Sequence, residues 1–310
     1  MRLSLRSALI VGVIVATDAV AHAADGGSIL FVGNSFTFGS GSAVRYYRSN
    51  TVTDLNNEGI GGVPALFKVF TVQAGLKFDV SLETRGGAGL DFHLQNKKAE
   101  IGSRPWDIVV AHGYSTLDQD KPRDPAKLIA TSKELAAVVR GKNPKVDLYL
   151  TSTWSRPDQV FPENGAWAGK PIEVMAQDIR VAYDKAAAGV SAKVIPVGDA
   201  FNRAIEVGFA DANPYNGLDA NTIDLWTFDN YHASTYGYYL EALMVFGRVT
   251  GRDPRSLGER ECSGMELGLS TAQVKQLQQI AFDELQTVAP VTANVKTYTE
   301  RGSAPRCPAN

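Results

Sequence analysis

The stretch Ser28-Ile-Leu-Phe-Val-Gly-Asn-Ser-Phe-Thr37 contains a continuous apolar run that ends in turn-forming residues. An apolar run without polar alternation is typical of a strand that is buried on both faces of a sheet. Four later segments are also short and rich in apolar residues: residues 78–83, 107–111, 146–151 and 193–197. Together with residues 28–33 they predict five buried strands.

Helical patterns occur between and after these strands. Apolar residues recur at three- and four-residue spacing, and proline stands at the expected first turn of the earlier helices. The predicted helices cover residues 64–74, 125–140, 171–188, 235–249 and 271–288. The alternation predicts an α/β fold in which crossover helices join parallel strands. The polar residues 209–221 are expected to form a long surface loop.

The two ends of the 310-residue chain differ in character from the region between them. Residues 1–23 have the pattern of a signal peptide, with two arginines, an apolar stretch and the small residues of Ala21-His-Ala23 before the cleavage site. An uncleaved anchor is the alternative. We expect export to the periplasm or the exterior, one domain over residues 24–289 and a C-terminal tail over residues 290–310.

Charge and cysteine content restrict the partners and the compartment. The 31 basic and 33 acidic residues give a net charge of −2 without a basic block, so we expect no nucleic acid partner. No membrane contact is expected after the signal peptide is cleaved. Cys262 and Cys307 are the only cysteines, and in an oxidising compartment they would form a disulfide that holds the tail. Two unpaired thiols are the alternative, because spacing does not fix pairing.

Ser35 directly follows the first predicted strand, in the sequence Gly33-Asn-Ser35. In an open parallel sheet, ligands bind at the carboxyl ends of the strands, where the connecting loops converge. A hydroxyl at this position is exposed to a ligand, and the turn can direct backbone N–H groups at a developing oxyanion. The same sequence is also compatible with an ordinary turn or a helix cap.

Asp229 and His232 stand directly before the helix predicted over residues 235–249. A separation of three residues across one tight turn can direct a carboxylate and an imidazole toward the same pocket. Serine requires a neighbouring base near neutral pH, which histidine supplies, and an aspartate can stabilise the imidazolium that forms. The alternatives are a helix-entry histidine and an N-terminal cap.

The segments around Ser35 and Asp229-Asn-Tyr-His232 together resemble the first and last blocks of the SGNH (GDSL-like) hydrolase superfamily, in the variant with Gly-Asn-Ser. The resemblance implies a three-layer α/β/α sandwich around a five-stranded parallel sheet of flavodoxin-like order. It also implies a carboxylic ester hydrolase in which Ser35 is the nucleophile, His232 the base and Asp229 its partner. The backbone N–H of Ser35 would contribute to the oxyanion hole.

The middle blocks of this superfamily are matched less closely. A glycine after the second strand donates its N–H to the oxyanion, and Gly87 aligns with it, with Gly86 as the neighbouring alternative. The third block has Gly113-Tyr-Ser115 where the superfamily has Gly-x-Asn. Ser115 is therefore the expected donor, with His112 and Tyr114 as alternatives. The loss of one donor typically costs about 3 kcal/mol of transition-state stabilisation.

Further substrate contacts are expected from Asn34, beside the nucleophile, and from Trp154 and Arg156, which follow the fourth predicted strand. An aromatic ring there can stack on a sugar, and a guanidinium can hold an anionic group. No cofactor, metal or nucleotide is predicted, and His93 is interpreted as a packing residue.

The predicted function is that of an exported serine esterase without a cofactor, acting on a small-molecule or carbohydrate ester. Ester groups on carbohydrate, such as acetyl groups, are favoured over lipid. A non-catalytic protein that binds a glycan or another partner on the same scaffold is the alternative.

Overall fold

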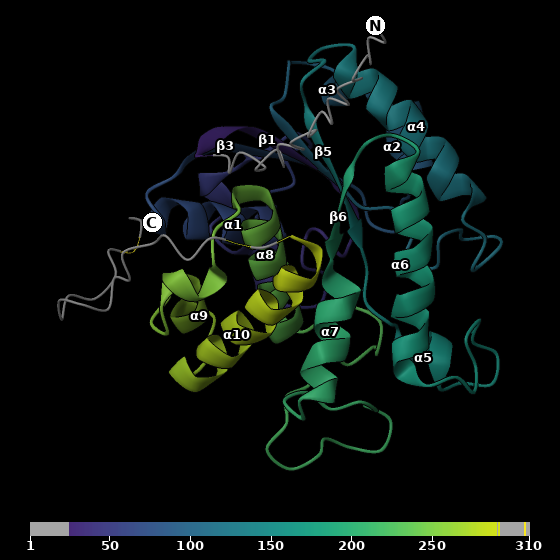
Figure 1. Ribbon diagram of the computed structural model, residues 1–310, viewed down its shortest axis with the longest axis vertical. Coiled ribbons are helices and arrows are strands. Elements are labelled where there is room, and N and C mark those ends of the chain that lie inside the picture. Colours follow the sequence, from purple (N-terminus) through teal and green to yellow (C-terminus); the bar gives the residue numbers. More distant parts are fainter. Residues whose placement is uncertain (1–24, 290, 292–306, 308–310) are drawn as a thin grey trace, which may run out of the picture.

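The computed structural model describes residues 25–289, 291 and 307 (Figure 1). The predicted signal peptide, residues 1–23, and most of the predicted tail lie outside the described residues. One parallel sheet has the strand order β2-β3-β1-β4-β5-β6. Its strands are β1 (Gly26–Gly33), β2 (Thr53–Asp54), β3 (Lys77–Thr84), β4 (Ile108–Ala111), β5 (Asp147–Ser152) and β6 (Lys193–Pro196).

Helices flank this sheet on both faces (Figure 1). They are α1 (Gly62–Gln73), α2 (Leu90–Asn96), α3 (Lys98–Ile101), α4 (Ala126–Arg140), α5 (Pro157–Val160), α6 (Ile172–Ala188), α7 (Val197–Glu206), α8 (Thr235–Thr250), α9 (Cys262–Glu266) and α10 (Thr271–Val288). One group contains α1, α8 and α10, and the other contains α2, α4 and α6. Among the described residues, no helix is long and apolar enough to cross a membrane.

The predicted α/β fold is confirmed, with one correction to the strand count. The five predicted strands correspond to β1 and β3 to β6, and without β2 their order is the flavodoxin-like one. The sheet has six strands because the two-residue strand β2 pairs with the outer side of β3. A two-residue edge strand with the polar sequence Thr53-Asp54 has no apolar run that could predict it. The surface loop predicted over residues 209–221 lies between α7 and α8, below α7 in Figure 1.

Strand β1 lies at the centre of the sheet and explains why the core forms there. It pairs with β3 on one side and with β4 on the other. Its residues Ile29, Leu30, Phe31 and Val32 are at most 1% exposed, so helices cover both of its faces. The carboxyl end of β1 therefore opens between two neighbouring strands, which is where loops from three strands can meet.

A disulfide joins Cys262, the first residue of α9, to Cys307. Replacement of Cys307 with serine is expected to lower the free energy of unfolding by about 4 kcal/mol, because a cross-link restricts the unfolded chain. The two cysteines of this disulfide are 45 residues apart in the sequence. The measurement is urea unfolding of the oxidised protein, with reduced wild type as the control. Equal midpoints for oxidised wild type and the variant would contradict the prediction.

Candidate active site

Ser35 lies in a tight turn at the carboxyl end of β1 and is 6% exposed. Two backbone hydrogen bonds close the turn, from the N–H of Phe38 to the carbonyl of Asn34 and from the N–H of Ser40 to the carbonyl of Ser35, both 3.0 Å long. A Cβ atom at Gly33 would overlap the side chain of Thr37, so only glycine fits there. The local sequence therefore fixes the position of the Ser35 backbone.

Asn34 ties this turn to the loops that follow the two neighbouring strands. Its Nδ2 donates to the carbonyls of Ala88 and Gly113, both at 3.0 Å, and its Oδ1 accepts from the N–H of Phe36 at 3.1 Å. The loops after β1, β3 and β4 thus meet at one point. Both Nδ2 protons of Asn34 are used in these bonds, so its amide joins the loops. Oδ1 keeps a second lone pair, and the substrate contact expected from Asn34 stays a prediction.

Asp229 and His232 form a hydrogen-bonded pair in the loop before α8. The distance from His232 Nδ1 to Asp229 Oδ2 is 2.6 Å. Asp229 Oδ1 accepts three further bonds, from Thr227 Oγ1 at 2.8 Å and from the N–H groups of Tyr231 and His232 at 3.0 and 2.9 Å. Partial burial opposes ionisation of Asp229, but these bonds, foremost that from the His232 side chain, lower its pKa to about 2. The carboxylate is therefore charged at neutral pH.

His232 Nε2 is the ring nitrogen available for proton transfer. Because Nδ1 faces a carboxylate, the proton of a neutral ring is held on Nδ1 and Nε2 keeps a lone pair. Nε2 is buried and has no hydrogen-bond partner among the described residues. An imidazole in this arrangement can accept a proton from a nearby hydroxyl.

The Ser35 turn lies against the loop that carries His232. The ring of Phe36 contacts the His232 ring edge to face, with centroids 5.7 Å apart. On α8, Tyr238 Oη donates to the carbonyls of Ser35 and Ser40, at 3.2 and 3.1 Å. Among the described residues no hydrogen bond joins Ser35 Oγ to His232, and such catalytic bonds are often long without substrate. The structure brings the two segments together without that bond.

Gly87 lies in the loop after β3. Asn34 binds the same loop through the carbonyl of Ala88. The φ of Gly87, +73°, is in the left-handed region, which favours glycine, and a Cβ there would have no atom within 4 Å. At Gly86 a Cβ would lie 3.6 Å from the ring of Phe38. Gly87 is exposed and belongs to a loop tied to the Ser35 turn through Asn34, and its role as an oxyanion donor stays the preferred prediction.

Ser115 stays the preferred prediction among the three third-block candidates. His112 is 2% exposed, and burial lowers its pKa to about 3, so its ring is neutral and enclosed. The ring of Tyr114 packs directly over Gly89, and its Oη lies 3.5 Å from Asp91 Oδ2. Ser115 is 8% exposed, and its Oγ accepts a 3.0 Å hydrogen bond from Arg156 Nη1.

The structure does not support substrate contact by Trp154. Its ring is fully buried between Phe36 and Phe201, with centroid distances of 4.1 and 5.0 Å and nearly parallel planes. The sequence could not reveal that the residues after β5 turn into the core at this position. Trp154 is therefore a packing residue that supports the Ser35 turn through Phe36.

Arg156 lies at the site, but its charge is already paired. Its Nε donates to Asp158 Oδ1 at 2.9 Å and its Nη2 to Asp158 Oδ2 at 2.5 Å. Its guanidinium carbon lies 3.6 Å from the centroid of the Tyr231 ring, and that ring is 4.2 Å from the His232 ring. The sequence interpretation missed Asp158 and Tyr231. The signal for Asp158 was its position two residues after an arginine, where a bidentate pair can form.

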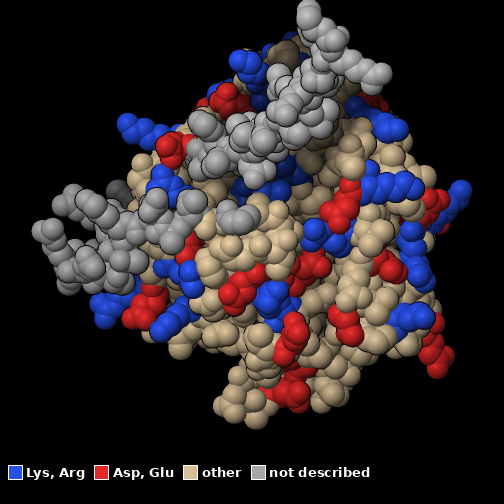
Figure 2. All heavy atoms as spheres, in the orientation of Figure 1, with Lys and Arg blue, Asp and Glu red and all other residues tan. Residues whose placement is uncertain are grey.

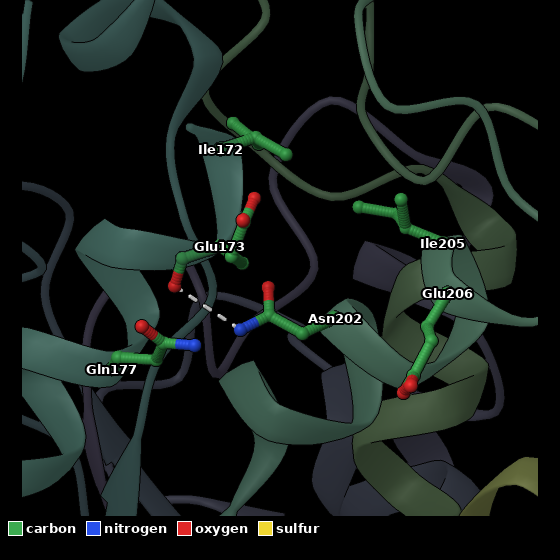
Figure 3. Close-up of a pocket in the computed structure, with 6 residues that line it drawn as sticks. All are labelled: Ile172, Glu173, Gln177, Asn202, Ile205 and Glu206. Carbon is green, nitrogen blue, oxygen red and sulfur yellow. Dashed lines mark hydrogen bonds between the residues drawn. The ribbon is translucent and has the colours of Figure 1, made fainter. Parts of the chain in front are cut away.

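Other groups lie outside this site. His93 is fully buried and pairs with Glu83, in agreement with its interpretation as a packing residue. Figure 3 shows a pocket of about 450 Å³ between α6 and α7, in which Asn202 Nδ2 donates to the carbonyl of Glu173 at 3.2 Å. It is lined by Ile172, Glu173, Gln177, Asn202, Ile205 and Glu206, none of which is a predicted site residue. Within residues 25–289, no cluster of three or more histidine, cysteine or acidic side chains could hold a metal ion.

Comparison with known proteins supports the fold. No protein-family model and no curated protein sequence matches the chain. It is similar to a DUF4886 family protein from Bacteroides uniformis, at 19% identity over 87% of this chain and 98% of that one, with a TM-score of 0.55. It is also similar to a protein from Parabacteroides merdae described as a GDSL-like lipase, at 16% identity over 74% of this chain and 97% of that one, with a TM-score of 0.52. A third similar structure is a variant of an acetyl xylan esterase from Geobacillus stearothermophilus. It is 18% identical to this chain, covers 74% of this chain and 96% of its own, and has a TM-score of 0.50.

Proposed function

From the SGNH hydrolase fold of this chain, we propose that it is an exported serine esterase in which Ser35, His232 and Asp229 form the catalytic triad. The observation that carries the proposal is the 2.6 Å hydrogen bond between Asp229 and His232, on a loop packed against the Ser35 turn. The Cys262–Cys307 disulfide is compatible with an oxidising compartment outside the cytoplasm.

The proposed reaction proceeds through an acyl-enzyme. His232 Nε2 takes the proton of Ser35 Oγ, which forms a bond to the ester carbonyl carbon. The resulting oxyanion accepts hydrogen bonds from the N–H groups of Ser35 and Gly87 and from the Ser115 hydroxyl. The C–O bond to the alcohol breaks as His232 returns the proton to that oxygen. A water molecule, deprotonated by His232, then attacks the acyl carbon and releases the acid and free Ser35.

An exposed aromatic residue beside the triad supports a carbohydrate ester as the substrate. Phe228, directly before Asp229, is 91% exposed, and Tyr46 is 62% exposed. The segments that carry them adjoin, because a Cβ at Gly41, five residues before Tyr46, would lie 3.2 Å from the side chain of Thr227. Exposed rings on polar loops suit stacking against sugar faces. Figure 2 shows acidic and basic side chains interspersed over the displayed face.

Replacement of Phe228 with alanine is expected to raise KM for an acetylated polysaccharide about threefold to tenfold, through the loss of one stacking contact. The rate with 4-nitrophenyl acetate should not change, since a small ester does not reach this ring. Acetate release from acetylated xylan measures the first effect. Val181→Ala, at a 70% exposed position on α6, is the matched control. An unchanged KM for the polymer would mean that the ring does not contact the glycan.

Labelling with a fluorophosphonate probe tests the proposed function without knowledge of the substrate, because only an activated serine reacts. We expect wild type to be labelled, and both Ser35→Ala and His232→Ala to remain unlabelled while folded. A folded wild type that takes no label would instead favour the glycan- or partner-binding alternative. That alternative is consistent with the third-block serine in place of asparagine and with the absence of a Ser35–His232 hydrogen bond in the described chain.

A further inference from the structure

Arg156 connects the two halves of the proposed site. Its Nη1 donates to Ser115 Oγ at 3.0 Å, on the oxyanion side. Its guanidinium lies over Tyr231, whose ring contacts His232 on the base side. Asp158 holds the other two nitrogens in a fork, which fixes the orientation of the guanidinium plane. The Arg156 side chain is 13% exposed, so these contacts are largely shielded from water.

The bond from Arg156 constrains the hydroxyl of Ser115. A serine hydroxyl has one proton and two lone pairs, and arginine can only donate. Arg156 therefore occupies a lone pair of Ser115 Oγ, and the Ser115 proton has to point elsewhere. Among the described residues, no acceptor takes this proton. Ser115 thus has a buried donor that is free for a ligand, two residues after the Gly113 carbonyl that Asn34 binds.

We propose that Arg156 is a positioning residue that turns the Ser115 hydroxyl proton toward the oxyanion. In the third block of the superfamily the donor is an asparagine amide, whose N–H direction is fixed without a second residue. Ser115 and Arg156 together would replace that amide. This inference rests on the proposed function. It also accounts for the Asp158 pair, because an Arg156 with its charge free would bind an anionic group instead of orienting the hydroxyl.

A double-mutant cycle with 4-nitrophenyl acetate tests the proposal. Ser115→Ala is expected to lower kcat about 100-fold, as for the loss of one oxyanion donor, with little change in KM. Arg156→Gln should lower kcat about tenfold in the wild-type background. In the Ser115→Ala background, Arg156→Gln should have less than a twofold effect, because no hydroxyl remains to be oriented. In the Ser115→Asn background, Arg156→Gln should likewise have less than a twofold effect, because the asparagine amide has its own fixed donors.

Equal, multiplicative losses in both backgrounds would overturn the proposal, because Arg156 would then act independently of Ser115. A rise in KM without a fall in kcat would also overturn it and would indicate direct substrate binding. Arg156→Met also removes the donor to Ser115 and carries the same test if Arg156→Gln does not fold, which thermal unfolding checks. Failure of the proposed function is separate, since wild type itself would then take no fluorophosphonate label.

Discussion

Replacement of Ser35 with alanine is expected to lower kcat for a carboxylic ester by on the order of a millionfold. The substitution removes the atom that forms the acyl bond and leaves the rest of the site in place. The turn should persist, because the carbonyl of Ser35 keeps its bonds from Ser40 N–H and Tyr238 Oη. Initial rates with 4-nitrophenyl acetate, measured after separation from any contaminating esterase, give the comparison.

Ser40→Ala is the matched control for the nucleophile. Ser40 is a second serine of the same turn, and it contacts Ser35 and Tyr238 through backbone atoms that alanine retains. Its kcat is expected to stay within threefold of wild type. A loss of less than tenfold for Ser35→Ala would reject Ser35 as the nucleophile and, with it, the proposed mechanism.

Most of the fold could be predicted because its strands are short segments rich in apolar residues that alternate with helical patterns. Residues 28–33 and 78–83 correspond to β1 and β3, and in these two segments every residue except Asp79 is buried. Strand β2 could not be predicted, because two polar residues at an edge need no periodic pattern. Helix α7 was also missed, since it begins at Val197 directly after β6 without an intervening turn signal.

The candidate site was predictable where its chemistry is local in sequence. Asp229 and His232 are three residues apart, and their contact follows from one turn. The contact between Ser115 and Arg156 spans 41 residues and depends on how the loops after β4 and β5 fold against each other. Trp154 shows the same limit, because only the tertiary structure directs its ring into the core.

Replacement of Asp229 with asparagine is expected to lower kcat about 10,000-fold through the wrong tautomer of His232. An asparagine side chain has one oxygen and one NH2 group. Its oxygen can keep the bonds that Oδ1 accepts from Thr227, Tyr231 and His232, so the loop should retain its fold. Its NH2 group would replace Oδ2 and donate to His232 Nδ1. That moves the ring proton to Nε2, which can then no longer accept the proton of Ser35.

This outcome separates a role for Asp229 in catalysis from a role in holding the loop. Thr227→Val removes one bond to Oδ1 but leaves the carboxylate facing His232, and its kcat is expected to fall less than tenfold. Fluorophosphonate labelling should slow in Asp229→Asn and stay rapid in Thr227→Val, with similar thermal midpoints for both. If the two variants lose activity equally, Asp229 acts by shaping the loop. If only Asp229→Asn loses activity, the negative charge of Asp229 and its acceptor oxygen Oδ2 are what make His232 a base.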